Sequence, residues 1–323
     1  MAMTPDQAQW FADTFSSVVR NVERAVMGKT EAVRLAVTCL LAEGHLLLED
    51  YPGTGKTTLA RAMAQSVQGQ SSRIQFTPDL LPSDVTGVTI YDQKSKEFEF
   101  HAGPVFANIV LADEINRASP KTQSALLEVM EESRVTVDGN PYPVGTPFMV
   151  IATQNPIEQA GTYRLPEAQL DRFLMKTTLG YPDRESSIRI LSTGGTRPRS
   201  AALAAVITTQ AVTEMSQLAS SVHIEPAVFD YIARIVEATR TATDVQLGAS
   251  IRGGLALTRC SRVWAASQGR HFVVPDDIKM LAVPCLAHRL IIDPEAEFNN
   301  VTGEQIMVEV IGAVQPPTER VDD

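Results

Sequence analysis

The segment between residues 45 and 58 contains two glycines followed by a lysine and two threonines, residue types that bind nucleotide phosphates. The apolar run 46–48 predicts a strand before the loop, and a helical pattern begins near Leu59. Glycines let the backbone curl so that its N–H groups face phosphate oxygens, and the positive end of the helix dipole faces the same anion. We therefore predict a phosphate-binding loop.

Two side chains of this loop have specific expected roles. Lys56 is expected to reach the β- and γ-phosphates, and the Thr57 hydroxyl to bind Mg²⁺. The usual motif begins with glycine, whereas this chain has Asp50 at that position, and an ordinary strand-to-helix turn is the alternative interpretation. We expect the nucleotide to be bound by Pro52, Gly53, Thr54, Gly55, Lys56, Thr57, Thr58 and Asp113.

Two further apolar runs end in polar residues. Residues 109–112 are followed by Asp113 and Glu114, and residues 147–152 lead to Asn155. Continuous apolar runs are typical of buried parallel strands, and ligands collect at the carboxyl ends of such strands. Asp113 is expected to hold Mg²⁺ with Thr57, directly or through water, and Glu114 to polarise the attacking water. Asn155 is expected to contact the γ-phosphate and that water. An exposed strand end and a turn asparagine before proline are the alternatives.

The bulk composition limits the class of protein. The chain has 323 residues, which suggests two domains, and 44% of them are hydrophobic. It contains no run of 18 apolar residues and no secretory signal pattern, so we expect no membrane span. Three widely spaced cysteines favour a reducing, cytoplasmic setting without disulfides. A net charge of −10 makes nonspecific nucleic-acid binding unfavourable.

The order and spacing of these motifs resemble the MoxR-type AAA+ ATPases through nearly the whole chain. The resemblance implies an α/β fold: an AAA+ P-loop nucleotide-binding domain with a parallel sheet flanked by helices and β-hairpin insertions, then a C-terminal all-α lid domain. We expect the ATPase core at residues 1–190 and the lid at 191–323, with residues 26–28 near the adenine. The matching segments are residues 47–57, 112–118, 121–128, 152–156 and 161–173.

The resemblance also implies a homo-oligomeric ring, usually a hexamer, with each ATP at a subunit interface. Arg172 resembles the arginine finger that contacts the γ-phosphate bound by the neighbouring subunit, a task that suits a planar guanidinium. Arg164 and Arg117 are further arginines that could share this interface role. The alternative for Arg172 is an ion pair with Asp171 or another nearby carboxylate.

Arg252 matches the lid arginine that contacts the γ-phosphate of its own subunit. The family tends to have Ser-Pro-Arg-Ala there, whereas this chain has Ser-Ile-Arg-Gly. A solvated arginine at a helix start is the alternative. Helical patterns at residues 229–236, at 250–268 and from Pro275 onward fit a helical lid.

Two segments between the motifs predict β-hairpins. Residues 96–100 alternate charged and aromatic side chains, and Asp138-Gly139 is a hairpin turn signal. Acidic residues outnumber basic ones in both segments, so neither suits contact with nucleic-acid phosphates. These segments favour a protein client or partner.

The combined expectation is an Mg²⁺-dependent ATPase with ATP and Mg²⁺ as its cofactors. By resemblance, the family is associated with chaperone-like remodelling or maturation of enzyme complexes, including metal insertion. Its partners often carry a von Willebrand factor A domain. The alternatives are a nucleic-acid-stimulated ring motor and a binding module that uses ATP only as a structural switch.

Overall fold

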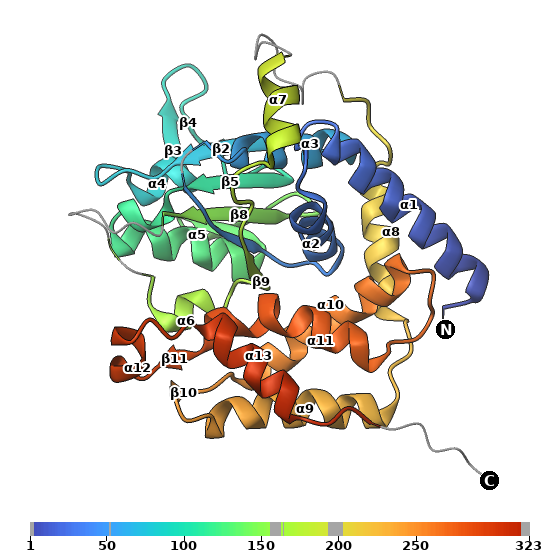
Figure 1. Cartoon of the computed structure of the whole chain (residues 1–323). Coiled ribbons are helices and arrows are strands. Elements are labelled where there is room, and N and C mark those ends of the chain that lie inside the picture. Colours follow the sequence, from blue (N-terminus) through green and yellow to red (C-terminus); the bar gives the residue numbers. More distant parts are fainter. Residues whose placement is uncertain (1–2, 52, 156–162, 164, 193–202, 318–323) are drawn as a thin grey trace. The chain divides into compact units, whose positions relative to one another are not determined.

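The computed structural model describes residues 3–51, 53–155, 163, 165–192 and 203–317 (Figure 1). The chain divides into two compact units. One comprises Ser17–Phe173 and Thr177–Thr213, and the other comprises Met1–Ser16, Leu174–Lys176 and Glu214–Asp323.

The centre of the first unit is formed by β2, β5, β8 and β1 of a five-stranded sheet, whose fifth strand, β9, has two of its three residues in the segment Leu174–Lys176. The strand order of the sheet is β2-β5-β8-β1-β9, and β2, β5, β8 and β1 pair in parallel. The expected apolar runs form its inner strands, and every residue of β5 is buried. Because the strands are parallel, their carboxyl ends lie at one edge of the sheet. The strands are β1 (Leu46–Glu49), β2 (Ser71–Gln75), β5 (Ile109–Asp113), β8 (Met149–Gln154) and β9 (Met175–Thr177).

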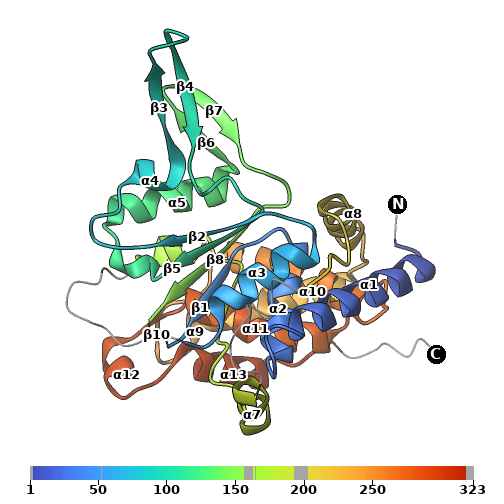
Figure 2. The same ribbon diagram turned by 90° about the horizontal axis from the view of Figure 1, so that it is seen from above.

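Helices cover both faces of this sheet, as expected for an α/β fold. The crossover from β1 to β2 runs in one direction across the sheet and the next crossovers run back, so right-handed connections put α3 and α5 on opposite faces. Figure 2 shows this arrangement. On the α5 side, the core includes the buried side chains of Phe76, Leu126 and Phe173. The helices of the unit include α2 (Thr30–Leu41), α3 (Lys56–Ser66), α4 (Pro82–Thr86), α5 (Pro120–Glu132), α6 (Glu167–Leu170) and α7 (Arg184–Ser192).

Both predicted hairpins are present and lie side by side (Figure 2). Asp138 and Gly139 have φ values of 50° and 78°, the left-handed backbone that a tight hairpin turn requires. The rings of Phe100 and Tyr142 stack with centroids 4.0 Å apart and join the two hairpins. The first hairpin pairs β3 (Gly87–Asp92) with β4 (Glu97–Ala102), and the second pairs β6 (Arg134–Val137) with β7 (Asn140–Pro143).

The second unit is mainly helical, and the predicted lid helices are present. One short antiparallel pair of strands, β10 and β11, was not expected, so the all-α description needs this correction. No helix among the described residues is both long and apolar enough to span a membrane. The elements are α9 (Pro226–Thr241), β10 (Val245–Leu247), α10 (Ile251–Ser267), α11 (Pro275–Leu286), β11 (Ile291–Ile292), α12 (Pro294–Phe298) and α13 (Gly303–Ala313).

Two helices cross the division between the units: α1 (Pro5–Glu23) and α8 (Thr209–Ser220). The sequence predicts the first of these over residues 4–27, and it ends at Glu23. Its predicted apolar face is buried, with Phe11, Phe15 and Val22 fully covered.

Candidate functional site

The predicted phosphate loop connects β1 to α3, and its glycines have the required backbone geometry. Gly53 and Gly55 have φ values of +86° and +100°, and nothing lies within 4 Å of an added Cβ at either position. The backbone conformation, rather than lack of space, therefore demands glycine. Pro52 lies outside the described residues.

Lys56 is the first residue of α3, where the helix presents N–H groups that have no partner within the helix. Its Nζ donates to the carbonyl oxygens of Asp50 at 3.1 Å and Tyr51 at 3.4 Å. Thr57 and Thr58 follow in the same first turn, and Thr54 Oγ1 donates to the Tyr51 carbonyl oxygen at 3.2 Å. The loop thus collects backbone donors and an ammonium group at one point, which suits an anion.

Asp50, which replaces the usual first glycine of the motif, is a buried structural carboxylate. It is 2% exposed, and its two oxygens accept hydrogen bonds from the backbone N–H groups of Leu179 and Gly180. This residue joins the start of the loop to the chain segment that follows β9. The sequence shows that Asp50 replaces the usual glycine, but it does not predict these partners, which lie about 130 positions away.

The two predicted carboxylates stand at the carboxyl end of β5. Thr153 on β8 connects them: its hydroxyl donates to Asp113 Oδ1 at 2.7 Å and accepts from the Glu114 N–H at 2.8 Å. Glu114 has left-handed backbone angles, φ 57° and ψ 51°, which are uncommon for a residue other than glycine. Such strain is concentrated at functional sites.

Two residues of β2 that sequence analysis missed contact these carboxylates. Arg73 donates to Asp113 Oδ2 through Nη2 at 2.7 Å and Nε at 3.2 Å, and Gln75 Nε2 donates to Glu114 Oε2 at 3.1 Å. Their spacing of two puts both on the same face of the strand. These contacts form because β2 lies next to β5 in the sheet, and the local sequence of β2 does not predict that pairing.

Asn155 directly follows β8, the strand between β5 and β1. Its place in the strand order therefore puts Asn155 between the strand that carries the carboxylates and the strand that precedes the phosphate loop. Neighbouring strands lie about 4.8 Å apart, so β5 and β1 are separated by roughly 10 Å. No group of three or more histidine, cysteine, aspartate or glutamate residues in the described part of the chain could hold a metal ion alone.

Comparisons with known proteins identify the family. The model of the ATPase family associated with various cellular activities (AAA) matches residues 45–175, and that of the AAA lid domain matches residues 237–310. Chaperone MoxR1 of Mycobacterium tuberculosis is 40% identical over 94% of this chain and 82% of its own. The chain belongs to the MoxR family of AAA+ ATPases.

Two other proteins are similar to this MoxR-family chain over nearly its whole length. The protein YeaC of Bacillus subtilis is 48% identical over 94% of each chain. A protein from Cytophaga hutchinsonii, described as a "putative ATPase", has a crystal structure that superposes with a TM-score of 0.90. That protein is 37% identical, and the match covers 97% of this chain and 98% of its own.

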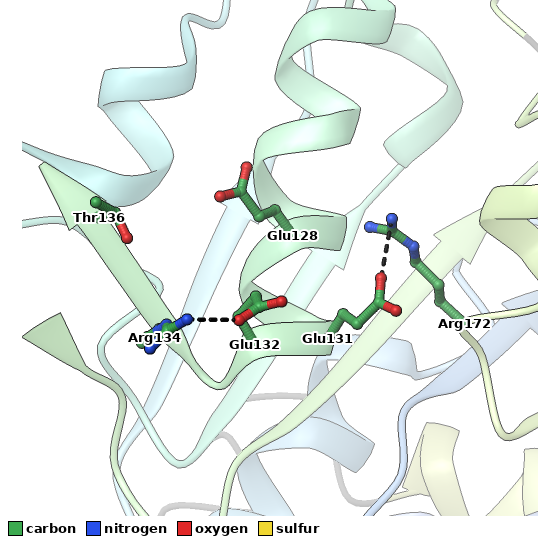
Figure 3. A pocket seen from close by; sticks show the side chains of 6 residues that line it. All are labelled: Glu128, Glu131, Glu132, Arg134, Thr136 and Arg172. Atoms are coloured by element: carbon green, nitrogen blue, oxygen red, sulfur yellow. Dashed lines mark hydrogen bonds and ion pairs between the residues drawn. The ribbon is translucent and has the colours of Figure 1, made fainter. Parts of the chain in front are cut away.

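Arg172, the predicted finger of this MoxR-family chain, follows α6 and precedes the buried Phe173. Its guanidinium is paired with a carboxylate, as the alternative interpretation allows, but the partner is Glu131 on α5 rather than Asp171. Arg172 Nη2 lies 3.0 Å from Glu131 Oε2 (Figure 3). Of the other two interface arginines, Arg117 pairs with Glu114 Oε2 at 3.0 Å, and Arg164 lies outside the described residues.

Arg252 lies in the second unit, as the second residue of α10, and it is exposed. The Ser250 side chain caps this helix by accepting from the Arg252 N–H at 3.1 Å. The following Gly253 is buried, and an added Cβ would lie 2.8 Å from Leu286 Cδ2, so close helix packing explains the glycine. The contact of Arg252 with a γ-phosphate stays a prediction.

Gly28, in the segment expected near the adenine, packs against the start of α7. Its φ is +70°, and an added Cβ would lie 2.5 Å from Ser186 Oγ and 2.6 Å from Asp183 Oδ2. The pKa of Asp183 is lowered mainly because its carboxylate accepts a hydrogen bond from the backbone N–H of Ser186, and to a smaller extent because it accepts one from the Ser186 hydroxyl.

Proposed function

We propose that this chain is an Mg²⁺-dependent ATPase that hydrolyses ATP at the subunit interfaces of a hexameric ring. The observation that carries the proposal is the convergence at one sheet edge of three features. These are the left-handed glycine loop with Lys56, the Asp113–Glu114 pair, and Asn155. Membership of an ATPase family supports the same reaction.

In this proposal the backbone of residues 52–58 and Lys56 bind the β- and γ-phosphates. Glu114 orients a water molecule and accepts its proton as the water oxygen attacks the γ-phosphorus in line. The bond between that phosphorus and the β–γ bridging oxygen breaks, which releases ADP and phosphate. Asn155 holds the water and the γ-phosphate in position. Most of the rate gain is positional and electrostatic.

Thr57 and Asp113 are the residues that would hold Mg²⁺ between them. Their oxygen donors suit this hard cation, which usually takes one or two protein carboxylates and completes its shell with phosphates and water. Bound Mg²⁺ supplies positive charge that offsets the negative charge of the phosphate oxygens.

Two arginines complete the site in the proposed ring. Arg172 contacts the γ-phosphate of the neighbouring subunit, and Arg252 contacts that of its own subunit from the lid. The core and lid would meet near residue 190. These roles rest on the family resemblance and on the family-model matches to an AAA domain and an AAA lid.

The energy of hydrolysis would drive chaperone-like remodelling or maturation of a client protein, including metal insertion, together with a von Willebrand factor A domain partner. The name Chaperone MoxR1 of a relative supports this class of activity. The β3–β4 hairpin also supports a protein client, because Tyr91 and Phe98 are 48% and 74% exposed on it. We propose a cytoplasmic location, which the three buried cysteines support because none of them forms a disulfide.

The test is a mixing experiment with two inactive variants. We expect Glu114→Gln to bind ATP without turning it over, and Arg172→Ala to bind ATP but lose at least about a thousandfold in rate. Mixed rings contain interfaces with an intact Glu114 and an intact neighbouring Arg172, so the mixture should regain phosphate release. Lys56→Ala and Glu114→Gln both disable the site of their own subunit, so a mixture of these two variants should stay inactive.

Three outcomes would contradict parts of this proposal. Full turnover by Glu114→Gln would remove its assignment as the base, and failure of every mixture would remove the role of Arg172 in trans. Absence of steady phosphate release by the unmodified protein would favour ATP as a structural switch. Strong stimulation by single-stranded DNA at moderate salt would favour the nucleic-acid motor.

A further inference from the structure

The side chain of Arg172 enters a polar pocket of ≈ 380 Å³ at the end of α5 (Figure 3). We call this the Arg172 pocket. It is lined by Glu128, Glu131, Glu132, Arg134, Thr136 and Arg172. Three carboxylates face two guanidinium groups there, so the formal charge of the lining is −1. The surroundings of the arginine are therefore acidic before any neighbour is present.

The two arginines of the pocket have separate partners. Arg134 Nη2 pairs with Glu132 Oε2 at 2.9 Å, and Arg172 Nη2 pairs with Glu131 Oε2 at 3.0 Å. Arg134 is thus engaged elsewhere, and Glu131 is the carboxylate that offsets the charge of Arg172. Both contacts are drawn as dashed lines in Figure 3.

The strength of the Arg172–Glu131 ion pair depends on its exposure to solvent. The two side chains are 29% and 42% exposed. Ion pairs this exposed are screened by water and are weak, whereas a guanidinium binds a phosphate in a strong, two-pronged geometry. The Glu131 contact is therefore suited to orient the arginine and to yield to a triphosphate.

We infer that Glu131 is a positioning residue that retains Arg172 in the isolated protomer and yields it to the nucleotide of a neighbour. This inference rests on the proposed finger role of Arg172. Assembly on ATP then includes an exchange in which the guanidinium leaves Glu131 for a γ-phosphate. The loss of the Glu131 contact opposes assembly, so Glu131 raises the protein concentration at which active rings form.

The exchange is reversible because Glu131 keeps its negative charge when Arg172 leaves. After hydrolysis and release of the γ-phosphate, the Glu131 carboxylate attracts the guanidinium back. Retention of Arg172 by Glu131 thus favours separation of two subunits whose interface no longer holds a γ-phosphate.

The test measures ATPase rate per subunit against protein concentration for the full-length chain. For Glu131→Gln, which keeps the shape and removes the charge, we expect the half-maximal concentration to fall roughly two- to fivefold, the range for an exposed ion pair. The matched control is Glu128→Gln, which makes the same charge change in the same pocket, and its curve should overlay that of the unmodified protein. Sedimentation with a nonhydrolysable ATP analogue should give the same shift, and sedimentation without nucleotide should give none.

Each result decides between the possibilities. An unchanged or higher half-maximal concentration for Glu131→Gln would overturn the inference, as would an equal shift for Glu128→Gln or a shift without nucleotide. Arg172→Ala separates this failure from failure of the finger role. If Arg172→Ala loses hydrolysis while Glu131→Gln behaves as the unmodified protein, the finger role stands and the retention does not. If Arg172→Ala hydrolyses ATP normally, the proposed function of Arg172 fails first.

Discussion

Arg73–Asp113 and Arg172–Glu131 are arginine–carboxylate pairs of the same compact unit, but their surroundings differ. The Asp113 side chain is 11% exposed and accepts from two nitrogens of Arg73 and from the Thr153 hydroxyl. The Glu131 side chain is 42% exposed, and its pair with Arg172 joins one nitrogen to one oxygen.

The difference shows that burial determines whether an arginine–carboxylate pair keeps a fixed geometry or can exchange its partner. A buried carboxylate that loses its partners pays a large desolvation cost, so its geometry is held. An exposed carboxylate is solvated by water when its partner leaves, so the pair is exchangeable. The first pair lies where the proposed nucleotide site needs fixed positions, and the second lies where the proposed ring needs an arginine that can exchange its partner.

The largest effect is expected at Asp50, whose carboxylate is even more buried than that of Asp113. Asp50→Ala leaves the N–H groups of Leu179 and Gly180 without their acceptor, and the free energy of unfolding should fall by about 2–5 kcal/mol. Urea denaturation of the full chain measures this loss. The control is Asp79→Ala, at an exposed loop position, which should change the free energy by no more than about 0.5 kcal/mol. Equal effects of the two variants would show that burial is not the deciding variable.

An intermediate effect is expected from Arg73→Ala. Asp113 keeps the Thr153 hydrogen bond but loses its cation, and the free energy of unfolding should fall by about 1–3 kcal/mol. This is less than for a fully buried pair, because the Arg73 side chain is 48% exposed. The matched control is Arg134→Ala, which breaks a pair in which both side chains are about half exposed. Thermal unfolding that ranks the two variants in the opposite order would break the comparison.

The smallest effect on stability is expected from Arg172→Ala. Its pair with Glu131 is exposed, so the free energy of unfolding should change by about 0–1 kcal/mol, whereas hydrolysis should be lost. Urea denaturation and phosphate release, measured on the same preparation, check the two halves of this statement. A loss of stability as large as that of Asp50→Ala would mean that Arg172 is structural and would account for lost activity without a finger role.

The local conformation of the candidate nucleotide site could be predicted from sequence because its parts are short segments of the chain. A few neighbouring residues determine the conformation of a glycine loop between a strand and a helix. The same is true of an Asp-Glu pair that follows an apolar run. The hairpin turn at Asp138 and Gly139 is local for the same reason. The fold class followed from the order of these parts and from the family resemblance.

Most of the missed contacts join segments that are distant along the chain. Arg73 and Gln75 contact carboxylates about 40 positions away because β2 pairs with β5, and Arg172 contacts Glu131 because α6 and α5 approach each other. The β10–β11 pair of the lid region also joins distant strands, which are too short to give a periodic pattern. Propensity and spacing carry no information about such neighbours.

The sequence by itself determined which residues have the chemistry for phosphate, metal and water, and in which order the elements carrying them occur. Only the tertiary structure decided which of these groups are already engaged: Asp50 with the backbone of Leu179 and Gly180, Asp113 with Arg73, and Arg172 with Glu131. The physical reason is that backbone conformation depends on near neighbours. The partner and the burial of a charge depend instead on strand order and helix packing, which the whole chain sets.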